Sequence, residues 1–198
     1  VFNCHSELKL SVSAGSHTND VASDFGLQSL QIFYPEMPRQ KTRFLKSIAA
    51  HYNYHKSEWE YGFGLGYGER APSVSEGYGF YLFNSSDRFD YVGNPNLSNE
   101  KSIETNAFIG YQKEKFNTKI SSSFFRISNY IIGTPDTALI PMTIGASGVK
   151  LYTALSYATI FNIDWNSEVT LSKSLKWNFG LLYSAGKDSN GNNLPLIN

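Results

Sequence analysis

The chain has 198 residues, enough for one ordinary domain, and its 17 basic residues balance its 17 acidic residues. A zero net charge without any local run of Lys and Arg argues against a nucleic-acid partner. Charged residues make up only 17% of the chain, against roughly 25% in soluble domains, and aromatic residues 15%, which indicates a membrane environment.

The sequence contains no stretch close to the roughly 20 apolar residues of a membrane-spanning helix. If the chain crosses a bilayer, it must therefore cross as tilted strands. The chain begins at Val1 without an initiator Met or a leader, which resembles a cut within a longer protein. Cys4 is the only cysteine, so it forms no disulfide within the chain, and we assign it no role.

Seven segments alternate between apolar and polar residues, as strands with one apolar face do. The clearest is Trp59 to Gly68, where five large apolar residues alternate with Glu60 and four glycines. Lys46 interrupts the apolar side of another segment, and Phe124 and Phe125 blur the alternation of a third. In chain order the segments are Leu8 to Ala14, Phe44 to Tyr54, Trp59 to Gly68, Ile103 to Tyr111, Thr118 to Tyr130, Leu155 to Leu171 and Leu175 to Ser184.

The connections between these segments alternate between short and long. The short ones lie near Lys56 and Ser57, Lys113 to Phe116, and Lys173 and Ser174; the long ones are Gly15 to Thr42, Ala71 to Asn99 and Ile132 to Lys150. In an up-and-down meander every second connection lies at the same end, so short turns gather at one rim and long loops at the other. We therefore predict an all-β fold, an antiparallel meander of about seven strands from a transmembrane β-barrel. The alternative is a soluble all-β sandwich or barrel, whose strands are usually shorter.

Two sequence motifs carry a family resemblance. Glu69-Arg70-Ala71-Pro72-Ser73 with Glu76 and Tyr78, and Gly93-Asn94-Pro95-Asn96-Leu97 with Glu100, resemble the barrel of TonB-dependent receptors. The likeness extends from about Leu8 to Asn198 and includes Leu194-Pro195 near the end. It implies an outer-membrane importer whose barrel of about 22 strands is closed by a plug and opened by an inner-membrane energy-coupling complex. Asn99 departs from the family, which often has Pro before the Glu of the second motif.

The resemblance also implies what this chain lacks. No segment resembles the plug domain or the TonB box, and Leu196-Ile197-Asn198 does not resemble the closing strands of such a barrel. We therefore assign residues 1–198 to one partial barrel domain in the bacterial outer membrane. Its implied partners are outer-membrane lipid, the plug and remaining strands of the parent protein, the TonB system and a small nutrient ligand. The two outermost strands should pair with another copy or a separate chain, unless the apolar face folds inward.

The motif residues are expected to shape an extracellular rim. Pro72 ends a strand, and Gly93, Asn94 and Pro95 have the chemistry of a turn. Arg70 and Glu76 are expected to form an ion pair inside the lumen, a structural role that we favour over ligand contact. The full structural motif is Arg70, Pro72, Ser73, Glu76, Gly93, Asn94 and Pro95.

The second long connection is rich in aromatic residues, which are costly in an exposed loop unless they are buried or bind a ligand. One hypothesis places the loop at the outer vestibule, in contact with ligand; the other packs its rings inside the lumen or against neighbouring loops. The candidate ligand-binding residues are Tyr78, Phe80, Tyr81, Phe83, Asp87, Arg88 and Tyr91.

No pattern calls for a metal, a cofactor or catalysis. His51 and His55 point the same way on a strand but lie roughly 13 Å apart, too far to chelate one ion. Cys4 and His5 point to opposite faces. The glycines Gly62 to Gly68 recur every second residue, unlike a phosphate-binding loop, and suit a wall approached by a plug or crowded by neighbouring rings. No hydrolase or nucleotide motif is present, so we expect no enzyme.

The leading interpretation is outer-membrane uptake of a siderophore, metal complex or other nutrient. The alternative is a soluble all-β module that binds a ligand or carbohydrate through exposed aromatic residues. Dependence on detergent separates the two, because a lipid-facing band requires amphiphile and an enclosed core does not.

Overall fold

The alternating segments form long strands of one sheet in the computed structural model, which describes residues 4–195. The start at Val1 and the end at Leu196 to Asn198, on which the sequence raised expectations, lie outside these residues. The long strands are β1 (Cys4–Asp20), β2 (Gln40–Lys56), β3 (Trp59–Arg70), β6 (Glu100–Lys113), β7 (Phe116–Asp136), β8 (Gly148–Ser172) and β9 (Leu175–Asp188).

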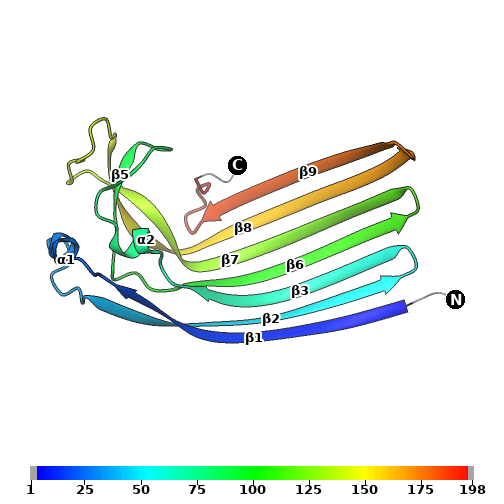
Figure 1. Ribbon diagram of the computed structural model, residues 1–198, viewed down its shortest axis with the longest axis horizontal. Coiled ribbons are helices and arrows are strands. Elements are labelled where there is room, and N and C mark those ends of the chain that lie inside the picture. The colour runs from blue at the N-terminus through cyan, green and yellow to red at the C-terminus, as the bar shows by residue number, and fades with distance from the viewer. Residues whose placement is uncertain (1–3, 196–198) are drawn as a thin grey trace.

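These seven strands pair in sequence order, each antiparallel to the next, as in the predicted meander (Figure 1). Two short strands, β4 (Leu82–Asn84) and β5 (Phe89–Val92), belong to the connection between β3 and β6. β5 joins the start of β8 in parallel, and β4 pairs with β5. The fold class predicted from the sequence is confirmed.

The connections separate to the two ends of the sheet (Figure 1). The turns 57–58, 114–115 and 173–174 lie at one end, and the loops 21–39, 71–99 and 137–147 at the other. The first and third loops were predicted too long. β1 ends only at Asp20 and β2 already begins at Gln40. Likewise, β7 ends only at Asp136 and β8 already begins at Gly148. Polar residues fill these strand ends, so apolar alternation does not mark them; the hydroxyls of Thr18 and Thr42, for instance, meet at 2.9 Å.

The large apolar side chains share one face of the sheet and remain exposed. Leu10 is 71% exposed and Trp177 62%. No second layer among residues 4–195 covers this face, so it neither folds inward nor forms the enclosed core of a sandwich. The exposed residues include Leu8, Leu10, Val12, Ile48, Tyr52, Trp59, Tyr61, Phe63, Leu65, Ile103, Ile109, Phe116, Ile120, Phe124, Phe161, Trp165, Trp177, Phe179 and Leu181.

The buried apolar residues gather mainly at the loop end instead. Leu30, Val92, Leu97 and Val149 are almost completely buried there, between loops and strand ends. The described part of the chain therefore has its small core under the loops, and the long wall of the sheet has an apolar face and a polar face.

Two short helices lie in the loops. In α1 (Asp24–Gln31) the Ser23 side chain accepts a hydrogen bond from the Gly26 backbone amide and caps the helix. A reciprocal pair of hydrogen bonds between Ser73 and Glu76 caps α2 (Val74–Tyr78). Neither described helix is long and apolar enough to span a bilayer.

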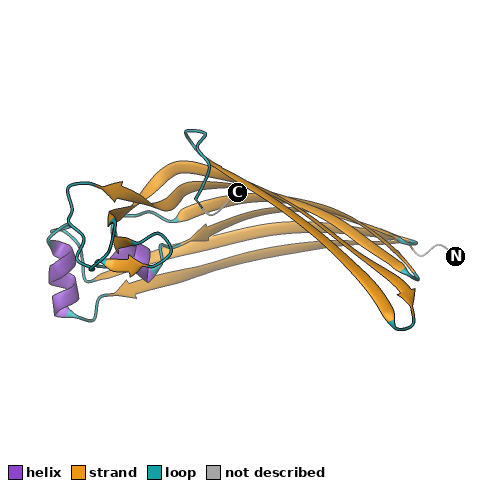
Figure 2. Ribbon diagram, turned by 90° about the horizontal axis from the view of Figure 1, so that it is seen from above, coloured by secondary structure: helices purple, strands orange, loops and turns teal. Residues whose placement is uncertain are grey.

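The sheet is open and curved (Figure 2). Among the described strands β1 pairs only with β2, and β9 only with β8. Pairing of these two outer edges with further strands stays a prediction.

Candidate functional site

The exposed apolar face carries a group of aromatic rings close to the tight turns. The Trp59 ring lies 6.1 Å from Tyr61 and 4.8 Å from Tyr111, and Tyr111 lies 6.2 Å from Phe116, between ring centroids. Aromatic residues at the margin of an outward apolar band are typical of membrane barrels. The short-turn rim therefore has the composition of a bilayer interface.

Lys46, which interrupts the apolar side of β2 between Phe44 and Tyr54, lies toward the loop end. Its ammonium group is 3.9 Å from a carboxylate oxygen of Glu69, which also accepts a hydrogen bond from the Tyr67 hydroxyl at 2.5 Å. The pair marks the level where the outer face becomes polar.

The glycines of β3 lie on the inner, more polar face, and neighbouring side chains occupy the space over two of them. A Cβ on Gly62 would meet the Phe108 ring at 2.0 Å, and one on Gly64 would meet Asn106 and His51 at 2.5 and 2.6 Å. A Cβ on Gly68 would have only one neighbour within 4 Å, at 3.9 Å. Crowding by neighbours therefore explains Gly62 and Gly64, whereas Gly68 has room above it.

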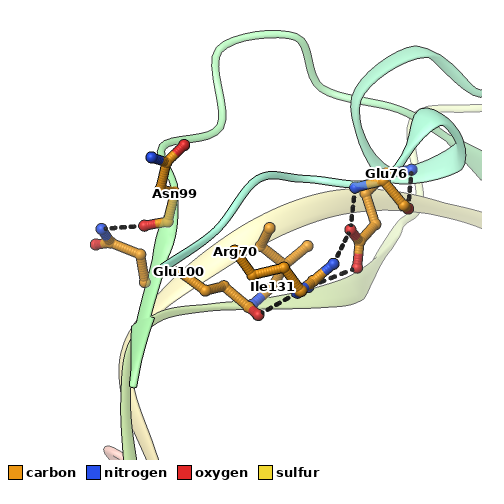
Figure 3. Close-up of polar contacts among 7 residues, drawn as sticks. Arg70, Glu76, Asn99, Glu100 and Ile131 are labelled. Carbon is orange, nitrogen blue, oxygen red and sulfur yellow. Dashed lines mark hydrogen bonds and ion pairs between the residues drawn. The ribbon is translucent and has the colours of Figure 1, made fainter. Parts of the chain in front are cut away.

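The first motif forms a charged cluster at the top of the wall (Figure 3). Arg70 donates through Nη1 and Nη2 to both carboxylate oxygens of Glu76, at 2.7 and 3.0 Å, and through Nε to Glu100 at 2.7 Å. The other oxygen of Glu100 accepts the backbone amide of Ile131 at 2.7 Å. The expected ion pair of Arg70 and Glu76 is present, and it links β3 and α2 to β6 and β7.

Glu76 also completes the cap of α2, because it accepts the Ser73 amide at 2.6 Å. Burial by itself raises the pKa of Glu76, but the hydrogen bonds from Arg70 and Ser73 outweigh it and hold the pKa below its ordinary value. The carboxylate therefore remains charged at neutral pH. Pro72 is buried between Arg70 and this cap, where it separates the strand from the helix.

The second motif is a tight, buried turn beneath α2. A Cβ on Gly93 would lie 2.6 Å from the backbone nitrogens of Tyr78 and Gly79, so only glycine fits. The Asn94 side chain accepts the Asn96 amide at 2.9 Å, as an Asx turn does. The Pro95 carbonyl accepts Lys41 Nζ at 2.7 Å, which ties the turn to β2.

Arg43 and Asn99 are further links between the second loop and β2 that the sequence did not reveal. Arg43 is 7% exposed and reaches the carbonyl of Leu97 at 3.3 Å. The Asn99 side chain donates to the carbonyl of Phe44 at 3.0 Å. The Asn99 carbonyl accepts from Asn129 at 3.1 Å (Figure 3). An amide at position 99 thus makes a contact that proline could not make.

The aromatic candidates of the loop divide by their surroundings. Phe80 and Tyr81 pack on each other at 5.1 Å and on Phe33 of the first loop at 6.2 and 6.4 Å, between centroids. The Tyr78 hydroxyl is buried without a hydrogen-bond partner among the described residues. Phe83 is 44% exposed. Phe80 and Tyr81 therefore pack against the first loop, whereas the Phe83 side chain remains exposed.

The charged candidates join the second loop to the third. Asp87 accepts Lys150 Nζ at 2.7 Å and the Tyr91 hydroxyl at 2.5 Å. Arg88 donates to the Gly145 carbonyl at 3.1 Å, and its own carbonyl accepts the Ser147 amide at 2.6 Å. Burial by itself raises the pKa of Asp87, but the hydrogen bonds from Lys150 and Tyr91 lower it below the ordinary value. Burial and Asp87 together raise the pKa of Tyr91 to about 12.

Asp90 was not singled out in the sequence, although it holds the third loop. It is 0% exposed, and Oδ2 accepts the backbone amides of Met142 and Thr143, both at 2.8 Å. Burial raises its pKa, but the hydrogen bonds from Thr143 and Met142 outweigh burial and leave the pKa below its ordinary value. A lone Asp in an aromatic loop gives no sequence signal for such a role.

The histidines belong to no three-ligand metal group among the described residues. In the described part of the chain, no three or more His, Cys, Asp or Glu side chains are arranged to hold a metal ion. His51 lies opposite Gly64 and His55 opposite Glu60, both on the inner face.

No protein-family model matches the chain, and no curated protein matches it. Solved structures do. The copper transporter OprC is 18% identical with a TM-score of 0.66, and the match covers 82% of this chain and 24% of that chain. The siderophore receptor PirA from Pseudomonas aeruginosa is 15% identical with a TM-score of 0.57, covering 92% and 40%. The ferric enterobactin receptor PfeA from the same species is 14% identical with a TM-score of 0.54, covering 90% and 33%.

These structures are TonB-dependent receptors, and this chain spans less than half of the length of each. The similarity runs along nearly the whole chain, whereas only a part of each receptor is matched. The chain therefore has the fold of a section of the barrel wall of TonB-dependent receptors.

Proposed function

We propose that this chain forms part of the barrel wall and three extracellular loops of an outer-membrane receptor that imports a small nutrient. The observation that carries this proposal is the two-faced wall itself. A seven-stranded meander exposes its apolar face, has tight turns at one end and has interlinked long loops at the other. A bilayer is the environment in which such a face is stable.

The proposal requires further protein. The free edges of β1 and β9 have unpaired backbone groups, which are costly in lipid, so we propose that further strands close the barrel. A plug domain would contact the inner face, and the TonB system would act through the parent protein. The solved receptors of the same fold support these partners.

The import of a siderophore or metal complex is proposed by analogy. The similar structures are named as a copper transporter and as siderophore receptors, and none is named as an enzyme. Uptake of radiolabelled ferric siderophores and of copper salts should fall in cells that lack the complete protein and recover when it is restored. Uptake of every such probe at wild-type level in the deleted strain would contradict the proposal.

Ligand contact is proposed for the open part of the second loop. Phe83 is exposed, whereas Phe80 and Tyr81 already pack on Phe33. Replacement of Phe83 with Ser in the complete receptor should weaken ligand affinity by about tenfold or more, as loss of an aromatic anchor does. Ser85→Ala, at an exposed position of the same loop, is the matched control. Unchanged affinity of the Phe83→Ser variant would contradict this role for the loop.

A further inference from the structure

Two of the four histidines of the chain face each other across neighbouring strands. The register of β1 and β2 places His5 directly opposite His55, although 49 residues lie between them in the sequence. We infer that His5 and His55 form a two-histidine binding site for a late first-row divalent metal ion, Cu²⁺ above all. The site lies on the inner face near the tight turns, because His55 is one residue before the end of β2 and opposite Glu60.

The pairing geometry brings the two side chains to one face. Directly opposite residues of antiparallel strands have Cβ atoms about 4.5–5.5 Å apart, and both point to the same side. Ser13 and Ser47 occupy an equivalent position on the same strands and the same face, and their hydroxyl oxygens meet at 2.8 Å. Two imidazoles at this separation can place one nitrogen each at the roughly 2.0–2.1 Å that a metal ion requires.

The surroundings suit an exchangeable ion. Both histidines are exposed and line a shallow cavity of about 340 Å³ together with Glu7 and Glu60. Those carboxylates already form ion pairs, Glu7 with Lys9 at 3.0 Å and Glu60 with Lys119 at 3.1 Å, so we do not count them as ligands. Since the described residues contain no three-ligand group, water would complete the coordination shell.

The preference for copper follows from coordination chemistry. Imidazole is a suitable ligand for Zn²⁺, Ni²⁺ and Cu²⁺, and affinity at a given nitrogen site rises to its maximum at Cu²⁺. The inference goes beyond the proposed uptake function, because it depends only on the register of β1 and β2 and on the face that the histidines share. Metal binding at this pair can therefore be measured whether or not the protein imports anything.

The test uses the complete protein that carries this chain, purified in detergent, with Cys4→Ser to remove the single thiol of the chain. Titration with Cu²⁺ is followed by electron paramagnetic resonance, which detects nitrogen ligands. His5→Ala and His55→Ala should each weaken binding at this site roughly 100-fold, because chelation by two linked groups exceeds single-group binding by about 10²–10⁴.

Two matched variants separate the pair from an ordinary surface histidine. His51→Ala should leave Cu²⁺ binding unchanged, since His51 faces Lys9 and Gly64. Lys9→His should create a second cross-strand pair with His51 and add one Cu²⁺ site of similar affinity. Binding that survives removal of both His5 and His55, or that weakens equally in His51→Ala, would overturn the inference. Failure of Lys9→His to add a site would do the same.

Discussion

At the scale of single residues, the inner wall shows why β3 alternates with glycine. The Phe108 ring occupies the space over Gly62, whereas a Cβ on Gly68 would have only one neighbouring atom within 4 Å, at 3.9 Å. Two glycines on the same face of one strand therefore differ in whether they can be replaced by a larger residue.

This difference gives a matched pair of variants. Gly62→Ala should lower the free energy of unfolding by about 1–3 kcal/mol, as overpacking does, because the Phe108 ring has to move. Gly68→Ala should be neutral or slightly stabilising, since alanine loses less conformational entropy on folding than glycine. Urea unfolding of the complete protein in detergent measures both values. An equal loss in the two variants would contradict the packing described here.

The sequence allowed the Arg70–Glu76 pair to be predicted, since the two residues belong to one local motif and are only six positions apart. It did not allow the partners of Glu100, Asp90 or Lys150 to be predicted. Their partners lie on other strands or loops, and only strand register brings them together. The sequence did not predict the His5–His55 pair for the same reason.

At the scale of elements, the strand centres could be predicted because large apolar residues of one face alternate there with small or polar residues of the other. The strand ends could not, because near the loops polar residues also occupy the face that is apolar elsewhere, as at Thr18 and Thr42. Apolar alternation does not indicate α2. The spacing of Ser73 and Glu76, which form its capping box, does indicate the start of a helix. The pairing of β5 with β8 had no local signal, since it joins segments from two different loops.

The second loop lies at the centre of the loop assembly, and three carboxylates hold it. Interactions with their partners lower the pKa values of Glu76, Asp87 and Asp90. Their contribution to stability is therefore fully present above the ordinary carboxylate range of about 4, and is lost as the pH falls through the lowered values. Tyr91, with its pKa raised to about 12, remains a hydrogen-bond donor throughout that fall.

A spin label at an engineered Met142→Cys should report this change, because the Met142 amide is held by Asp90. The label should remain ordered at neutral pH and become mobile only below about pH 4. Asp90→Asn should already increase its mobility at neutral pH. Asp188→Asn is the control, since Asp188 binds only the turn that follows β9. Mobility that does not change on acidification would contradict this account of the loops.

At the scale of the whole molecule, the described chain is a curved wall with no core behind its apolar face. Its buried residues lie under the loops, and its largest apolar side chains are exposed on one side. We therefore expect lipid to cover that side and further strands to pair with the edges. The central claim is therefore the sidedness of the wall.

Single cysteines at four consecutive positions of β3 test this claim most directly. In the complete protein with Cys4→Ser, reconstituted in lipid vesicles, spin labels are placed at Leu65, Gly66, Tyr67 and Gly68 in turn. The labels at Leu65 and Tyr67 should collide with oxygen dissolved in lipid and be shielded from a water-soluble nickel complex, and those at Gly66 and Gly68 should show the reverse. Equal exposure of all four labels to water, or lipid contact at the glycine positions, would contradict the account.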